Sequence, residues 1–599
     1  MDVGGWSGEL NSHVLKFNGY LFKDQSVIAL DAQEIGLLIE AAENKWNHVE
    51  PAIFGTLLER ALDGKERAKL GAHYTPRDYV ERLVMPTVIE PLRADWAGVQ
   101  AAAASLIDAG KTDEARGLVE LFHGQLAQTR VLDPACGTGN FLYVAMARMM
   151  ELEGEVVGLL TELGDHQYVA ELSGHTITPE NFLGLEINPQ AAAIAQLVLW
   201  IGYLQWHFRV NGEARLPPEP VLRDVKTIKN RDALIDWDKR VPEMDEDGKP
   251  LTRWDGETMK PHPVTSKKVP SDDAQVEVWR YVNPKAAKWP KADFIVGNPP
   301  YIGVRKINQR LGERYVDAVR TVFCDLPGTV DFVMYWWDYA ARLVRKKTAW
   351  RFGFITTNGI VQDYSRPVVE RHIDAKANPL SLVYAVTNHP WVENKDGAAV
   401  DVAMTVGAAA GESAEIRIAQ VTRTGRNFEL NVAHVTRINA ALSNIPNVFA
   451  AKGLKSNKGM CFQGVVPAAE GFKISATSGF ARDSDVVKPY MIGDDQTERF
   501  GHTHIIDFFG FEEAHALESH PSEFSKVFNE VEPERDQNPR KSYKEKWWLF
   551  AEPRPNLRKA ITSLPRYIGT RYTAVHRPRA GEGAESGRPS PCAQARDPR

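Results

Sequence analysis

The sequence predicts an α/β protein in which a doubly wound sheet is preceded by a helical region and followed by an α+β domain. Between residues 129 and 410, strand-like runs alternate with helical patterns, as in sheets whose two faces are both covered by helices. From about residue 450 onward, short strand-like runs mix with Gly, Pro, basic and aromatic residues, which indicates a separate domain. The chain of 599 residues suffices for roughly two to four domains.

The composition argues against membrane, secreted and disulfide-stabilised classes of protein. No apolar run approaches the ~18 residues of a membrane span, and the start, MDVGGWSGEL, lacks the basic and apolar regions of a signal peptide. The four cysteines are far apart and show no metal-ligand spacing. The net charge of -6 does not favour a nucleic-acid partner, so any basic face must be local. We expect a cytoplasmic protein that contacts no membrane and holds no metal.

Residues 1–128 form the predicted helical region. Apolar residues recur at helical spacing across 26–70, and the loop GAHYTP follows at 71–76. The alanine-rich, charged segment 95–128 is expected to form a helical hairpin at the surface.

Residues 129–410 form the predicted sheet domain. Its first strand starts at Val131 and leads through DPACGTGN into a helix, and NFLGLEI followed by AAAIAQLVLW is a second unit of this kind. The next strands end near VKTIKN and DFIVG, and FGFITT and AAVDVAMTV are later strands. Residues 237–290, rich in charge, Pro and Gly, predict an insertion or a long loop. Ligands of such sheets bind at the carboxyl ends of the strands, so the turns there form the candidate site.

The rest of the chain divides into a second domain at 411–576 and a tail at 577–599. The tail contains no Leu, Ile, Val, Met, Phe, Tyr or Trp, so we expect it to be disordered. It directly follows a strand-like run at 566–577, which suggests that the second domain is truncated.

The turn Asp133-Pro-Ala-Cys-Gly-Thr-Gly-Asn140 predicts a nucleotide-like ligand. Gly137 and Gly139 allow a sharp turn and a close approach of the backbone, and the helix that follows offers free amide hydrogens. The spacing matches neither the dinucleotide fingerprint nor the triphosphate loop. The alternative is a turn that only packs helix on strand. Cys136, inside the turn, is interpreted as a small side chain beside the ligand and not as a nucleophile.

Two acidic residues follow at later strand ends. Glu186 is placed to accept both hydroxyl hydrogens of a ribose, although a solvated carboxylate at a strand end is common. Asp232 is placed to bind an adenine amino group, and its alternative role is a helix N-cap.

The run Asn298-Pro-Pro-Tyr301 ends a buried strand with a rigid turn. Pro299 and Pro300 fix the backbone, so the loop carbonyls and the Asn298 amide oxygen can converge on one amino group while Tyr301 presents a flat face. This arrangement predicts a receptor for an extruded nucleic-acid base.

Taken in order, the glycine turn at 133–139, Glu186, Asp232-Ala-Leu and Asn298-Pro-Pro-Tyr resemble the motifs of class I S-adenosylmethionine-dependent DNA adenine-N6 methyltransferases. The upstream Gly71–Pro76 run resembles the cofactor motif of that family. The sequence is similar to the methyltransferase part of type IIG-like restriction-modification and related phage-defence enzymes. The resemblance implies a mixed, Rossmann-like sheet with one antiparallel strand near its end, and a target-recognition domain at 411–576.

The resemblance also assigns roles to residues of this sequence. It implies S-adenosylmethionine as cofactor, with contacts from Tyr74, Thr75, Asp133, Ala135, Gly137, Gly139, Glu186 and Asp232. It places the target adenine against Asn298, Pro299, Pro300 and Tyr301, with Asp331 and Asn358 in later motifs of the base pocket. The first 60 residues lack a nuclease-like cluster of carboxylates and lysine, so restriction by this chain alone is not expected.

The expected partner is double-stranded DNA, together with other subunits of a restriction or defence complex. Between Arg535 and Arg579, 12 Lys or Arg stand against three acids and are interleaved with aromatic residues. Such a segment predicts phosphate contacts, while Trp547 and Trp548 are also suited to a domain core. Two alternatives remain open: a non-catalytic specificity subunit that binds DNA, and a methyltransferase acting on RNA or on protein glutamine.

Overall fold

The computed structural model describes two compact units, residues 1–448 and 449–599. Within them it describes residues 5–8, 11–14, 29–43, 49, 53, 75–164, 176–212, 227–256, 258–261, 268–391, 401–411, 416–424, 427–446, 451, 454–474, 484–490, 492, 503–536 and 541–569. Tyr74, most of the Gly71–Pro76 motif and the tail lie outside the described residues.

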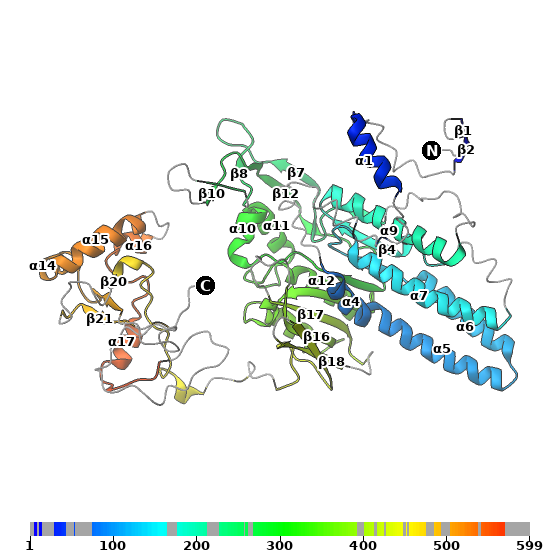
Figure 1. Cartoon of the computed structure of the whole chain (residues 1–599). Helices are drawn as coiled ribbons and strands as arrows, with labels where there is room; N and C mark the ends of the chain where they lie inside the picture. Colours follow the sequence, from blue (N-terminus) through cyan, green and yellow to red (C-terminus); the bar gives the residue numbers. More distant parts are fainter. Residues whose placement is uncertain are drawn as a thin grey trace. The chain divides into compact units, whose positions relative to one another are not determined.

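The first unit is built on a nine-stranded mixed sheet (Figure 1). In spatial order the strands are β19 (Asn427–Val435), β18 (Ile416–Thr424), β16 (Leu380–Pro390), β17 (Asp401–Ala409), β15 (Arg351–Thr357), β14 (Phe294–Gly297), β3 (Val131–Asp133), β4 (Phe182–Glu186) and β5 (Ile228–Asn230). The strands from β15 to β5 are parallel to one another, and β17 runs antiparallel to both of its neighbours. A mixed α/β fold with a large mixed sheet is therefore confirmed, and the sheet continues beyond residue 410.

Both faces of this sheet are buried. Val131 and Phe294 belong to one hydrophobic cluster, while their chain neighbours Leu132 and Ile295 belong to another, as the two-residue period of a strand requires. Helices supply much of the two clusters: α7 (Asn140–Glu162) and α9 (Pro189–Asn211) contact β4, and α12 (Met334–Arg345) contacts β15 and β17. Near-continuous apolar strands such as Phe294–Gly297 follow from burial on both sides.

The helical region before the sheet contains α1 (Ala32–Glu43), α4 (Arg77–Val84), the π-helix η2 (Met85–Ile89), α5 (Glu90–Asp108) and α6 (Thr112–Gln128). The expected hairpin is confirmed, since α5 and α6 lie side by side (Figure 1). Trp96 stacks on Phe122 between them, with ring centroids 5.1 Å apart, and both side chains are buried.

The segment 237–290, predicted as an insertion or a long loop, is an antiparallel β-ribbon inserted between β5 and β14, so the long-loop alternative was wrong. Four nested pairs form this ribbon, which we call the β-ribbon (Ile235–Ala286): β6 (Ile235–Asp236) with β13 (Lys285–Ala286), β7 (Lys239–Pro242) with β12 (Trp279–Val282), β8 (Thr252–Trp254) with β11 (Gln275–Glu277), and β9 (Met259–Pro261) with β10 (Lys268–Pro270). Its strands are short and mostly exposed, so they carry charges and prolines that resemble a loop. The β-ribbon leaves the sheet beside α10 (Val304–Leu311) and α11 (Glu313–Val322) (Figure 1).

The second unit combines a small sheet with helices. The strands β20 (Lys473–Ile474), β22 (His504–Ile506) and β21 (Val487–Pro489) pair in that order, and the helices are α14 (Glu513–Ser519), α15 (Pro521–Asp536), α16 (Lys541–Glu545) and α17 (Pro555–Ile561). Trp547 and Trp548 are buried in its core, as the sequence allowed.

Two of the basic residues predicted to contact phosphate are buried in this unit, which corrects that prediction for them. Arg535 donates to the carbonyl oxygens of Leu549 and Pro467, and Arg558 makes a two-pronged bond to the carboxylate of Asp507. Lys546, Lys559 and Arg566 are exposed. Among the described residues, no helix is long and apolar enough to cross a bilayer.

Candidate active site

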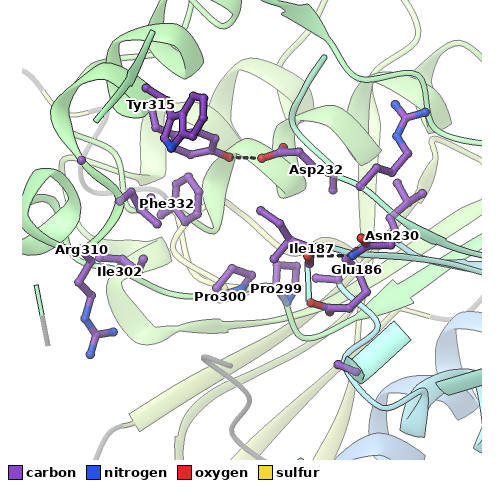
Figure 2. A pocket seen from close by; sticks show the side chains of 18 of the residues that line it. Glu186, Ile187, Asn230, Asp232, Pro299, Pro300, Ile302, Arg310, Tyr315 and Phe332 are labelled. Carbon is purple, nitrogen blue, oxygen red and sulfur yellow. Dashed lines mark hydrogen bonds between the residues drawn. The ribbon is translucent and has the colours of Figure 1, made fainter. Parts of the chain in front are cut away.

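A cavity of about 1450 Å³ opens where β3, β4, β5 and β14 end (Figure 2). The structure brings most of the predicted site residues to its wall: Thr75, Ala135, Gly137, Glu186, Asp232, Asn298, Pro299, Pro300 and Tyr301. Asp133 and Gly139 are not among the lining residues, and Tyr74 lies outside the described residues.

The glycine turn depends on two left-handed residues. Gly137 has φ 52° and Gly139 has φ 84°, values that a side chain would strain. A Cβ atom on Gly139 would also lie 3.1 Å from the Cα atom of Ala195 in α9. The indole nitrogen of Trp336 donates to the Pro134 carbonyl oxygen at 3.1 Å and holds the turn from the other side.

Asp133 lies beneath this turn, fully buried at the end of β3. Its Oδ1 atom accepts a hydrogen bond from the Ala135 N–H at 3.0 Å. A Cβ atom on Gly297 would lie 2.4 Å from the same oxygen, so the Asn298 loop can approach only because residue 297 is glycine. Burial, followed by the nearby charge of Glu186, raises the pKa of Asp133 to about 8.

Glu186 ties the glycine turn to β4. Its two carboxylate oxygens accept hydrogen bonds from the N–H groups of Gly137 at 2.9 Å and Asn188 at 2.8 Å. Burial raises the pKa of this carboxyl, and the backbone hydrogen bonds oppose that shift. Each oxygen keeps a second lone pair for a ligand hydroxyl, because a carboxylate can accept about four hydrogen bonds.

Asp232 accepts hydrogen bonds from three donors. Its alternative role as a helix N-cap was wrong, because the strand β6 and not a helix follows it. Its Oδ1 atom accepts from the N–H groups of Leu234 at 2.7 Å and Ile235 at 3.0 Å. Its Oδ2 atom accepts from the Tyr315 hydroxyl at 2.7 Å, the contact drawn across the upper part of Figure 2. Burial raises the pKa of Asp232, and these three donors limit the rise.

Asn298 lines the cavity and carries a buried acceptor. Its amide nitrogen donates to the Thr75 hydroxyl oxygen at 3.1 Å, and the carbonyl oxygen of Thr75 is bound by the Asn140 amide at 2.8 Å. The Oδ1 atom of Asn298 is buried and has no hydrogen-bond partner among the described residues. Such an atom is costly unless a ligand supplies a donor.

Tyr301 meets Trp391, which follows β16, edge to face with ring centroids 6.5 Å apart. Of the later motif residues, Asp331 accepts from the Thr357 hydroxyl at 3.4 Å and does not line the cavity, whereas its neighbour Phe332 does. Asn358 bonds to Asn388 at 2.5 Å, also away from the cavity.

Several lining residues were missed by sequence reasoning. Tyr315 comes from α11, and Trp237, Arg253 and Tyr281 come from the β-ribbon. A single Tyr in a helix and residues of a loop-like segment carry no pattern that marks a site. Cys136 behaves as expected of a non-nucleophile, since burial and then the charges of Glu186 and Asp133 raise the pKa of its thiol.

The family described as "MmeI, DNA-methyltransferase domain" matches residues 108–419, more than half of the chain. This chain belongs to that family. The predicted relationship to methyltransferases of restriction-modification systems is therefore confirmed.

Two curated relatives match this chain over only part of their own length. DNA methyltransferase A of Bacillus subtilis (strain 168) is 23% identical over 398 residues, which are 65% of this chain and 37% of the relative. A putative type II restriction enzyme and methyltransferase of Methanocaldococcus jannaschii is 26% identical over 205 residues, 32% of this chain and 17% of the relative. The chain thus spans well under half the length of these relatives.

A solved structure of the type IIL restriction-modification enzyme MmeI in complex with DNA superposes with a TM-score of 0.62 at 21% identity. The match covers 89% of this chain and 64% of that one. At this identity the likeness concerns the fold.

Proposed function

We propose that this chain is a site-specific DNA methyltransferase that transfers a methyl group from S-adenosylmethionine to N6 of an adenine flipped out of a duplex. The observation that carries this proposal is the buried, unpartnered Oδ1 atom of Asn298 at the cavity wall. Family membership and the likeness to restriction-modification enzymes support the DNA substrate and the restriction-modification setting.

The Asn298 loop suits an exocyclic amine. The amine of adenine is a poor nucleophile because its lone pair is delocalised into the ring. Two acceptors, Asn298 Oδ1 and the Pro299 carbonyl oxygen, would hold its two hydrogens and favour a pyramidal nitrogen, while Tyr301 stacks on the ring. With the cofactor and the base bound, this nitrogen would bond to the methyl carbon as the sulfonium–methyl bond broke, and the amine would release one proton to water. Alignment of this kind can contribute several kcal/mol.

The residues present fit S-adenosylmethionine, which would supply an electrophilic methyl group on a sulfonium. Glu186 offers free lone pairs for the ribose hydroxyls, and Asp232 offers one for the adenine amino group. Ala135 and Gly137 line the cavity beside them, as the motif predicts for the methionine end. Because Asp133 and Gly139 lie behind this wall, we assign them to the shape of the turn as well as to the cofactor site. We interpret the sheet as the Rossmann-like arrangement of these enzymes.

We assign target recognition to the second unit. An adenine inside a duplex cannot reach the cavity, so base flipping must be offset by contacts elsewhere. The exposed Lys546, Lys559 and Arg566 are the basic residues of this unit that we assign to phosphates.

The test combines cofactor binding with methyl transfer. The purified chain should bind S-adenosylmethionine in calorimetry and place methyl groups on unmethylated DNA, with the modified base and its site read by single-molecule sequencing. Asn298→Ala should keep cofactor affinity and lose transfer by about a hundred-fold or more, whereas the matched amide variant Gln100→Ala, exposed on α5, should behave as wild type.

Each other outcome identifies an alternative. Failure to bind the cofactor would favour a specificity subunit that only binds DNA. Methyl groups found on RNA or on protein glutamine, or on cytosine, would overturn the choice of substrate.

A further inference from the structure

The β-ribbon connects the two halves of the candidate active site. It begins at Ile235, three residues after Asp232, and the chain that leaves it enters β14, which ends beside Asn298. Its residues Trp237, Arg253 and Tyr281 line the same cavity. The ribbon is therefore placed to act on both the cofactor side and the base side.

Arg253 of the β-ribbon binds the last turn of α10. Arg253 Nη1 donates to the Gln309 carbonyl oxygen at 2.9 Å, and Nη2 donates to the Arg310 carbonyl oxygen at 3.2 Å. These carbonyls belong to the last turn of α10, where backbone acceptors have no partner within the helix. A guanidinium also suits the negative end of the helix dipole.

Two glycines allow the β-ribbon and the end of α10 to approach closely at this contact. A Cβ atom on Gly256 of the β-ribbon would lie 2.3 Å from the Gln309 carbonyl oxygen, and one on Gly312 would lie 2.7 Å from Arg253 Nε. Both glycines have left-handed φ values, 87° and 86°. A second tie lies nearby, where Arg314 of α11 makes a two-pronged ion pair with Glu243, at 2.8 and 2.6 Å.

The Asn298 loop leads directly into α10. Gly303, the N-cap of α10, comes two residues after Tyr301. The intervening Ile302 is buried, and its carbonyl oxygen accepts from the Phe332 N–H at 3.2 Å. A shift of α10 is thus passed to the loop through one short, packed connection.

We propose that Arg253 is a positioning residue for methyl transfer, because its bonds to the last turn of α10 fix the Asn298–Tyr301 loop relative to the cofactor side of the cavity. This inference rests on the proposed function. Arg253 acts through α10 and does not take part in the chemistry. The β-ribbon then contributes to methyl transfer by holding this loop in position.

The test compares Arg253→Ala and Arg253→Lys with wild type and with Lys239→Ala, an exposed position on the same ribbon. Initial rates on unmethylated plasmid DNA should give a kcat about ten- to a hundred-fold lower for Arg253→Ala, because small misplacement of reacting groups is costly. S-adenosylmethionine affinity, measured by calorimetry, should change less than three-fold. Lys cannot reproduce the two-pronged contact, so Arg253→Lys should restore only part of the rate, and added guanidinium ions should restore part of the rate to Arg253→Ala.

Hydrogen exchange supplies a readout independent of activity. Peptides covering 298–311 should exchange faster in Arg253→Ala, while peptides of α7 should not change. If wild type methylates DNA but Arg253→Ala matches it in kcat and in exchange, the positioning role is wrong. If wild type does not methylate DNA, the proposed function fails, and faster exchange at 298–311 would still support the contact between Arg253 and the loop.

Discussion

The amide nitrogen of Asn298 donates to the hydroxyl oxygen of Thr75, 3.1 Å away, and both residues line the cavity. The two residues are 223 positions apart in sequence. The bond joins Thr75, which precedes the sheet, to the loop that follows β14 near the centre of the sheet, so the orientation of the Asn298 amide depends on both segments.

Thr75→Val should lower kcat while it keeps the shape of the side chain. Without the hydroxyl, the Asn298 amide loses its acceptor and can rotate, and the expected loss is about ten-fold, the value of one hydrogen bond of ~1.4 kcal/mol. Steady-state rates at saturating S-adenosylmethionine measure the effect. Thr75→Ser keeps the hydroxyl and should retain most of the rate; equal losses in both variants would contradict the orienting role.

Tyr315→Phe should weaken cofactor binding more than it changes kcat. The variant removes the donor to Asp232 Oδ2, which both orients this carboxylate and lowers its pKa. The dissociation constant for S-adenosylmethionine should rise about ten-fold, as for loss of one hydrogen bond to a charged group. Tyr339→Phe is a matched control, because its hydroxyl donates to the Ala287 carbonyl oxygen outside the cavity lining. An equal effect in the control would refute a specific role for Tyr315.

Asp133→Asn should change how stability depends on pH. Since burial raises the pKa of Asp133 to about 8, the folded protein keeps this proton where the unfolded chain, with a pKa near 3.9, has released it. The stabilisation is complete below about pH 4 and is lost as the pH rises through about 8. Asparagine keeps an acceptor for the Ala135 N–H and does not titrate. From pH 5 to 9 the unfolding temperature of wild type should fall relative to the variant, and parallel curves would contradict this assignment.

The sequence allowed prediction of the strand ends and of the motif residues, because both depend on local patterns. Asp133, Glu186 and Asn298 each stand at the end of a short apolar run, and parallel strands bring their carboxyl ends together. The β-ribbon escaped prediction because its short strands are exposed and carry the charges of a loop. Tyr315 and Arg253 were missed because their partners, Asp232 and α10, are distant in sequence and only the packed fold brings them together.

Two glycine positions should respond to alanine with opposite signs. Gly353 in β15 is packed so closely that a Cβ atom would lie 2.1 Å from Thr87 Oγ1, whereas Gly98 in α5 is exposed and has open space around it. Gly353→Ala should destabilise the first unit by about 1–3 kcal/mol through overpacking. Gly98→Ala should stabilise it by about 0.5–1 kcal/mol through helix propensity. Urea unfolding followed by circular dichroism gives both values; destabilisation by both variants would show that the space at Gly98 is not open.

Substitutions of the neighbours Arg558 and Lys559 should affect two different properties, core stability and DNA binding. Arg558 is buried against Asp507, at 2.6 and 3.2 Å, and lies over the ring of Phe509 at 4.3 Å, so Arg558→Ala leaves a buried carboxylate without its main partner. The expected loss of stability is about 3–5 kcal/mol, seen as a lower unfolding temperature.

Lys559, on the same helix, is exposed, so Lys559→Ala should leave the unfolding temperature unchanged. Its affinity for a DNA duplex should fall, and the slope of log affinity against log salt should decrease by about one, because one phosphate contact is lost. Titrations at several salt concentrations measure this slope. An unchanged slope in Lys559→Ala and in Arg566→Ala would exclude this face from DNA contact, because an exposed cation that binds phosphate must release counterions on binding.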